Sequence, residues 1–137
     1  MEYGNIIPGK CIGNIHLRMN MEQVNNLVSI DKVENLQNCY ILQSKNIKIW
    51  VNKKEDKVTQ ILVEGEFKGK YKDAIGIGST LHDIQKKLNL NWYEDLDCYF
   101  LDGVEGICFE LGDSGDDQHW YEEIAPIIAI SVFSKEG

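Results

Sequence analysis

The sequence predicts an α+β domain, a tandem repeat in which a helix is followed by a three-stranded antiparallel meander, with the helices packed on antiparallel sheet. The first observation is self-similarity, because residues 15–24 align with residues 75–84 at a shift of 60. The second is that each copy has one stretch with apolar residues at helical spacing and then segments that alternate with period two. We therefore expect a single domain over residues 1–137, with internal repeats at about 9–66 and 70–134.

The alignment between the two copies continues beyond the first stretch. At a shift of 59, Cys39-Tyr40-Ile41-Leu42 falls on Cys98-Tyr99-Phe100-Leu101. At a shift of 60, Ile47, Ile49 and Val51 fall on Ile107, Phe109 and Leu111. After an insertion in the second copy, Ile61 and Val63 fall on Ile130 and Val132. A register that persists while exposed residues differ indicates a constraint from the fold.

Each predicted helix has a capping signal at its start. In the first copy, Asn20 precedes Gln23 by three residues, which is the spacing of a reciprocal cap, and Met21, Val24, Leu27 and Val28 form an apolar stripe. In the second copy, Thr80 and Asp83 have the same spacing, and Leu81, Ile84 and Leu88 form the stripe. Helices of about ten residues need a sheet to pack against.

Alternating segments predict the strands. In the first copy we expect a hairpin of 40–42 and 47–51 around Ser44-Lys45-Asn46, then a third strand over 58–63. In the second copy we expect strands near 97–101, 106–111 and 126–133. Residues 65–72 are the predicted junction between the copies.

Composition limits the class of protein. The chain has 137 residues, 43% hydrophobic and 26% charged, as in ordinary globular domains. It has no run of 18 apolar residues, and its start has neither a basic region nor an apolar one, so we expect no membrane association and a cytoplasmic location. The four cysteines are then expected to be reduced, with Cys39 and Cys98 as small core residues.

The two copies differ strongly in charge. Residues 1–72 hold 11 Lys and Arg against 8 Asp and Glu, a net charge of +3, whereas residues 73–137 hold 3 against 14, a net charge of −11. From Leu88 to Ser134 there is no Lys or Arg. Such a surface attracts a cationic protein and repels nucleic acid, so the expected partner is a basic protein.

The candidate partner-binding residues are acids and aromatics of the second copy. Segment 112–123 has no counterpart in the first copy, which has only a short Lys-rich turn there, so it is a candidate binding loop. Aromatic side chains within a charged patch are typical interface anchors. The alternative is a merely solvated acidic face, with the tryptophans packed over the edge of the core. The candidates are Trp92, Glu94, Asp95, Asp97, Asp113, Asp116, Asp117, Trp120, Tyr121, Glu122 and Glu123.

No pattern indicates catalysis or a cofactor. Asp113, Asp116 and Asp117 resemble calcium loops in composition but not in spacing, and no cysteine pair has zinc-ligand spacing. We therefore expect no metal, no cofactor and no enzymatic activity. The alternative is a small-ligand or enzymatic site in a cleft between the copies, where Cys108, Glu110 and His119 could converge.

The phrase Ile-x-Leu-x-Met-Asn-Met-x-x-Val-x-x-Leu at 15–27, followed by strands, resembles the repeat of the β-lactamase inhibitor protein and of the SmpA/OmlA outer-membrane assembly lipoproteins. A small acidic chain of this kind also resembles the immunity proteins of bacterial contact-dependent and polymorphic toxin systems. The resemblance implies a protein-binding inhibitor that blocks a cognate basic toxin, often a nuclease. Its carboxylates would then take the place of the phosphates of the toxin's substrate.

Overall fold

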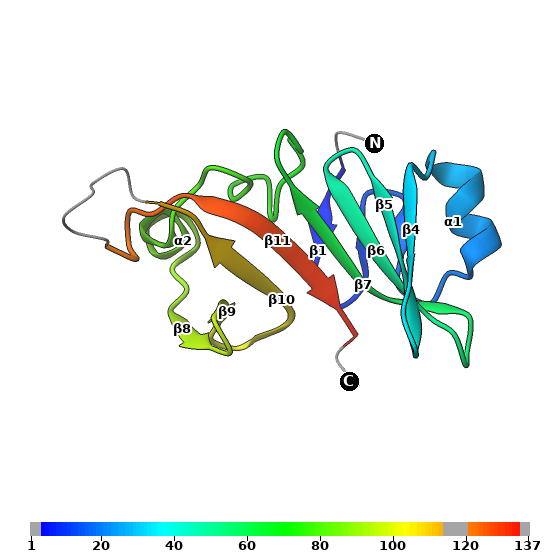
Figure 1. Ribbon diagram of the computed structural model, residues 1–137. Coiled ribbons are helices and arrows are strands. Elements are labelled where there is room, and N and C mark those ends of the chain that lie inside the picture. The colour runs from blue at the N-terminus through cyan, green and yellow to red at the C-terminus, as the bar shows by residue number, and fades with distance from the viewer. Residues whose placement is uncertain (1–3, 114–120, 135–137) are drawn as a thin grey trace.

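The computed structural model describes residues 4–113 and 121–134, in which strands dominate (Figure 1). The largest element is an eight-stranded antiparallel sheet of order β4-β5-β6-β7-β11-β10-β9-β8, and a three-stranded sheet of order β1-β2-β3 precedes it in the chain. The strands are β1 Ile6–Ile7, β2 Cys11–Ile12, β3 Ile15–His16, β4 Lys32–Asn35, β5 Cys39–Ser44, β6 Ile47–Asn52, β7 Lys57–Glu64, β8 Trp92–Asp95, β9 Cys98–Leu101, β10 Val104–Leu111 and β11 Ile127–Phe133. The helices are α1 Met21–Leu27 and α2 Leu81–Leu88.

The predicted fold class, α+β with a tandem helix and three-stranded meander, is wrong. Of the residues that the structure describes, strands hold 44% and helices only 12%, so this part of the protein is mostly β. The helices have seven and eight residues, and each is followed by four strands instead of three. The three short strands β1–β3 were not predicted either. The missed strands β4 and β8 are the two edges of the eight-stranded sheet, and both are short and mostly exposed, as edge strands commonly are. All eight strands join in one sheet.

The two helix starts predicted from the sequence are confirmed. The Asn20 side chain accepts a hydrogen bond from the Gln23 backbone N–H (2.8 Å), and the Gln23 side chain accepts one from the Asn20 N–H (2.9 Å). Thr80 and Asp83 form the same reciprocal pair at the start of α2, at 3.1 and 3.0 Å. These bonds satisfy backbone donors that the first turn of a helix leaves free.

The two four-stranded runs meet at the central pair of β7 and β11. Ile61 pairs with Val132, and Val63 pairs with Ile130. This pairing is symmetric under the predicted alignment, in which Ile61 corresponds to Ile130 and Val63 to Val132. Two halves related by a local two-fold axis between the strands would pair in this way. The duplication itself stays a prediction.

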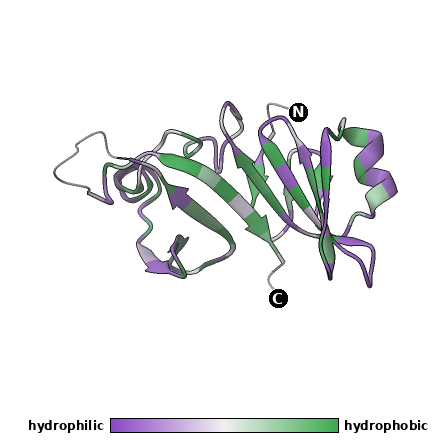
Figure 2. Ribbon diagram, in the orientation of Figure 1, coloured by the Kyte–Doolittle hydropathy of each residue, from purple (hydrophilic) through white to green (hydrophobic). Residues whose placement is uncertain are grey.

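The eight-stranded sheet has one covered face and one open face. The covered face carries Leu42, Ile49, Ile61, Phe109 and Ile130, which form one buried cluster with Val24 of α1 and with Leu81 and Ile84 of α2. Because side chains alternate along a strand, the neighbouring residues Leu62, Cys108, Ala129, Ser131 and Phe133 point to the opposite face. This face is called the open face below because the two helices pack on the other one, although Leu62, Cys108, Ala129 and Ser131 are themselves buried. Figure 2 shows mostly hydrophobic residues along β7 and β11 and mostly hydrophilic residues along α1.

The N-terminal segment and the junction are tied to the sheet. Tyr71 of the predicted junction is buried and bridges both Ile6 and Ile75. The Gly9 N–H donates to the Gly106 carbonyl of β10 (3.0 Å). A Cβ on Gly106 would lie 2.5 Å from the Gly9 nitrogen, so this approach requires glycine. The junction is therefore part of the folded body.

Neither helix of the described part of the chain has the length and apolar character needed to cross a bilayer.

Candidate functional site

The predicted partner-binding residues of β8 lie on two different faces. Trp92 and Glu94 point to the covered face, where they pair in register with Leu101 and Tyr99. Tyr93 and Asp95 point to the open face, because they are the alternate residues of the same strand. The acids of this edge strand therefore do not form one patch.

Tyr99 brings three of the predicted residues together. Its hydroxyl donates to Glu122 Oε2 (3.2 Å), and Glu94 also lies within hydrogen-bonding reach of it. The Trp92 ring packs edge-on against the Tyr99 ring, with centroids 6.1 Å apart. Burial raises the pKa of the Tyr99 hydroxyl, and the two flanking carboxylates raise it further because they disfavour a phenolate. The ring thus ties β8 and β9 to the turn that precedes β11.

A two-residue turn at the sheet edge exposes a large apolar side chain. Leu96 and Asp97 join β8 to β9, and both have positive φ, of 53° and 63°. Turns of this kind favour Asn or Gly, so Leu96 is unusual there. The Leu96 side chain is 85% exposed. Asp97, a predicted site residue, therefore lies at the tip of the hairpin beside an exposed hydrophobic group.

The predicted loop at 112–123 is only partly described. Asp113, Tyr121 and Glu123 are exposed, and Tyr121 is 49% exposed. Glu122 is half-buried against Tyr99. Asp116, Asp117, His119 and Trp120 lie outside the described residues.

The sequence did not reveal an aromatic row on the open face. The rings of Tyr93 and Phe100 are stacked, with centroids 5.6 Å apart and an interplanar angle of 20°. The Phe100 ring meets the Phe133 ring edge-on, at 6.3 Å and 80°. These residues come from β8, β9 and β11, and Tyr93 is 50% exposed. The one sequence feature that could have indicated this row is Tyr93 next to the acids Glu94 and Asp95. The contact of Phe100 with Phe133 could not be seen in the sequence, because it depends on the order of the strands in the sheet.

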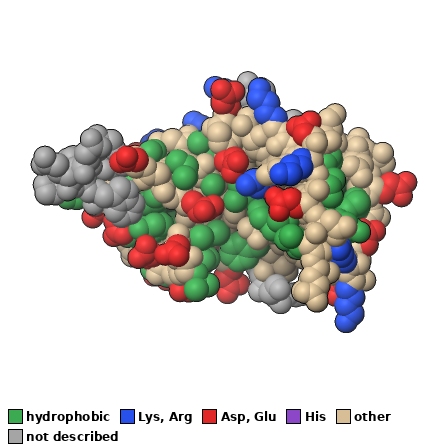
Figure 3. Space-filling model, in the orientation of Figure 1, with side chains coloured by type: hydrophobic (Ala, Val, Ile, Leu, Met, Phe, Trp, Pro, Cys, Tyr) green, Lys and Arg blue, Asp and Glu red, His purple; other side chains and the backbone are tan. Residues whose placement is uncertain are grey.

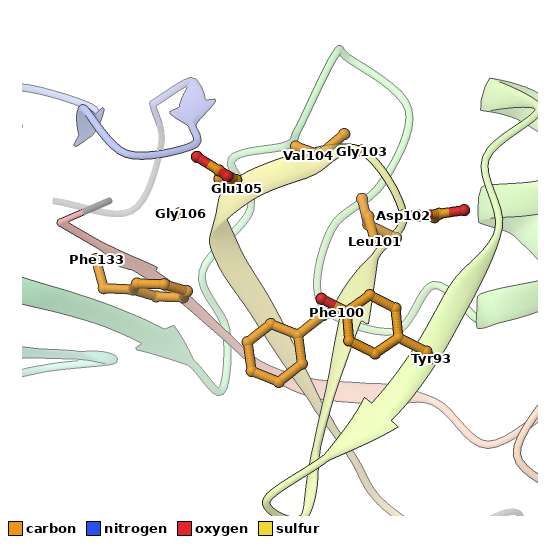
Figure 4. A pocket seen from close by; sticks show the side chains of 9 residues that line it. All are labelled: Tyr93, Phe100, Leu101, Asp102, Gly103, Val104, Glu105, Gly106 and Phe133. Carbon is orange, nitrogen blue, oxygen red and sulfur yellow. The ribbon is translucent and has the colours of Figure 1, made fainter. Parts of the chain in front are cut away.

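A pocket of about 570 Å³ lies beside this row (Figure 4). The β9–β10 turn and the start of β10 form its other wall. The pocket is lined by Tyr93, Phe100, Leu101, Asp102, Gly103, Val104, Glu105, Gly106 and Phe133. Figure 3 shows acidic side chains spread over the half built by β8–β11, with apolar side chains between them.

All four cysteines are free thiols. Cys11 and Cys108 are buried, whereas Cys39 and Cys98 are only half-buried, so the prediction that Cys39 and Cys98 are core residues is wrong. Burial is the main cause that raises the pKa of Cys108 to about 12, and contact with Cys98 adds to it. No cluster of three or more metal-ligating side chains occurs within residues 4–113 and 121–134.

The alternative site predicted between the two copies stays a prediction, and the copies meet at the centre of the sheet. There β7 and β11 are hydrogen-bonded neighbours over five residue pairs. Cys108 pairs with Ser131, and Glu110 pairs with Ala129, both on the open face of β10 and β11. The two residues therefore lie on a continuous sheet surface.

No family model matches the chain, and no curated protein matches it in sequence. Among solved structures, it is similar to a cysteine-rich secretory protein from Staphylococcus aureus subsp. aureus Mu50, with a TM-score of 0.52 and 13% identity. The match covers 98% of this chain and 50% of the other, so the chain spans about half the length of that protein. At this identity the likeness concerns the fold alone. The resemblance to toxin-immunity proteins and to the inhibitor and lipoprotein module stays a prediction.

Proposed function

We propose that the chain is a protein-binding module that docks a basic protein on its C-terminal half. The observation that carries the proposal is the absence of Lys and Arg from Leu88 to Ser134, in a half that exposes acids beside large apolar side chains. Charge of one sign speeds association with a partner of the other sign, and exposed aromatic groups supply contact area that desolvates on binding.

In its most specific form the proposal is an inhibitory role, in which the chain blocks a basic toxin, such as a nuclease, as an immunity protein does. Carboxylates at exposed positions would pair with the Lys and Arg side chains that bind the toxin's substrate. Leu96 at the hairpin tip and Tyr93 on the open face would supply apolar anchors at the same end of the molecule.

Affinity purification with matched charge-reversal variants tests whether basic proteins dock on the C-terminal half of the chain. Three proteins are immobilised at low salt: the full chain, an Asp95→Lys/Glu123→Lys variant in the C-terminal half, and a Glu55→Lys/Glu66→Lys control in the N-terminal half. All four substituted side chains are exposed. We expect basic proteins that are eluted by salt to be retained by the wild type and the control but not by the first variant.

Equal retention by all three baits, or retention of acidic proteins, would contradict the proposal. The inhibitory form is tested separately, by assaying each retained protein for nuclease activity with and without the chain. A nuclease that binds the chain and stays fully active would exclude inhibition, but it would still support docking of a basic protein.

A further inference from the structure

The pocket beside the aromatic row combines ring surface with carboxylates. Figure 4 shows the Phe100 and Phe133 rings on one side, and the Tyr93 hydroxyl directed toward the pocket. Glu105 lies at the rim between Val104 and Gly106, and in this view its carboxylate and that of Asp102 both point away from the rings. Both acids are exposed. Ring faces and carboxylates are the groups that bind organic cations in proteins.

Elsewhere in the chain, aromatic rings are already covered by the protein's own cations. Lys53 Nζ lies 4.7 Å from the centroid of the Tyr40 ring, and Lys72 Nζ lies 5.6 Å from that of Tyr71. Both pairs belong to the N-terminal half of the sequence. The pocket has no such group, because its lining includes neither Lys nor Arg and the chain holds none from Leu88 to Ser134. Among the residues that the structure describes, the lining of this pocket therefore offers carboxylates and rings to a cation of another molecule.

The shape of the site favours a planar cation. The stacked rings of Tyr93 and Phe100 lie nearly parallel, Phe133 stands across Phe100, and all three flat side chains line the pocket. A guanidinium group can stack on a ring while its N–H groups reach a carboxylate, whereas an ammonium group acts as a point charge. The volume of about 570 Å³ also leaves room for the stem of a long side chain and for water.

The scaffold around the pocket is held in place by backbone contacts. Gly106, which lines the pocket, accepts a hydrogen bond from the Gly9 N–H (3.0 Å). The Ser134 N–H donates to the Thr59 carbonyl (3.3 Å) directly after Phe133. These bonds anchor the two walls to different elements, so the pocket exists before a ligand enters it. A preformed site loses less entropy on binding.

We propose that this pocket binds an arginine side chain of a basic protein partner, with the guanidinium on the aromatic row and the exposed Glu105 side chain rotated so that its carboxylate pairs with it. This inference deepens the proposed function, because it rests on the partner being basic. The pocket then makes the specific contact with one arginine of the partner, and the other acids of this half attract the basic partner through their net negative charge.

An arginine peptide provides a direct test. An acetylated and amidated tetra-arginine peptide is titrated at low salt into the full chain labelled for nuclear magnetic resonance, beside a citrulline peptide of the same length, which is uncharged. We expect the largest shift changes in the Phe100 and Phe133 rings and the Gly106 amide. We expect the affinity for the citrulline peptide to be lower by a factor of about ten or more.

Three variants locate the contact. Glu105→Gln is expected to weaken the arginine peptide about three- to tenfold, and Phe100→Leu, which keeps an apolar side chain, about two- to fivefold. Glu110→Gln is the matched control, since Glu110 is an exposed acid of the same strand that does not line the pocket. We expect it to change the affinity less than about twofold.

Equal effects of Glu105→Gln and Glu110→Gln would overturn the pocket assignment, as would shift changes centred on Asp95 or Tyr99. Absence of any binding of the arginine peptide would overturn it too. The charge-reversal purification is independent of these outcomes. A basic protein retained in that experiment would support the proposed docking on the C-terminal half even if no arginine entered the pocket.

Discussion

The hydrogen bond from the Tyr99 hydroxyl to Glu122 is expected to stabilise the fold measurably. Tyr99 is 4% exposed, and Glu122 is half-buried in the turn before β11. A hydrogen bond to a charged acceptor contributes about 1.5–3 kcal/mol when it is well shielded. Because Glu122 retains some contact with water and the distance is 3.2 Å, we expect a coupling of about 1 kcal/mol.

A double-mutant cycle isolates this contribution. Urea unfolding of Tyr99→Phe, Glu122→Gln and the double variant gives the coupling between the two side chains. The Phe ring keeps the apolar contacts of Tyr99, including the edge-on contact with Trp92, so the cycle reports the polar contact. A coupling of about 1 kcal/mol corresponds to roughly 3–5 °C in Tm for a chain of this size. Strictly additive effects would refute the reasoning.

The alkaline limb of stability reports on the whole environment of the Tyr99 hydroxyl. The fold raises the pKa of Tyr99, mainly through burial and then through the flanking carboxylates. The neutral phenol is therefore favoured in the folded state. This contribution is complete below the unfolded pKa of about 10 and is lost as the pH rises above that value. Stability should fall more steeply above pH 10 in the wild type than in Tyr99→Phe, and parallel curves would contradict this.

Three further outcomes follow from local geometry. Thr80→Ala removes the acceptor for the Asp83 N–H (3.1 Å) and should lower the unfolding free energy by about 1 kcal/mol, whereas Thr80→Ser should not. Gly106→Ala would bring a Cβ within 2.5 Å of a backbone nitrogen at a φ of +84°, so urea unfolding should show a loss of about 2 kcal/mol or more. Iodoacetamide at pH 8 should modify half-buried Cys39 well before buried Cys108, whose pKa is about 12 because burial disfavours the thiolate; mass spectrometry would show the reverse order if this is wrong.

The sequence predicted local features better than the sheet as a whole. The helix caps at Asn20 and Thr80 depend on side chains three residues apart, so the pattern was sufficient. The inner strands were predicted because their alternate residues are buried in the core. The edge strands β4 and β8 were missed because each has only four residues and three of the four are exposed, so no buried face imposes a period-two pattern.

The aromatic row could not be predicted, for a different reason. Phe100 and Phe133 are 33 positions apart in the chain, and their contact requires that β9 and β11 flank the same part of β10. Strand order at this distance is a tertiary property. The acids beside them were visible as a run of charge, but their division between the two faces follows from the register of β8 with β9.

The two predicted copies place opposite charges around corresponding rings. Tyr40 lies under the ammonium group of Lys53, whereas Tyr99, its counterpart in the sequence alignment, donates to the carboxylate of Glu122. The divergence in charge therefore reaches specific side-chain contacts beyond the general surface. Lys53 covers the Tyr40 ring in the first copy, whereas neither Lys nor Arg is among the residues that line the aromatic pocket of the second. The proposed cationic partner would therefore gain most by binding at this pocket.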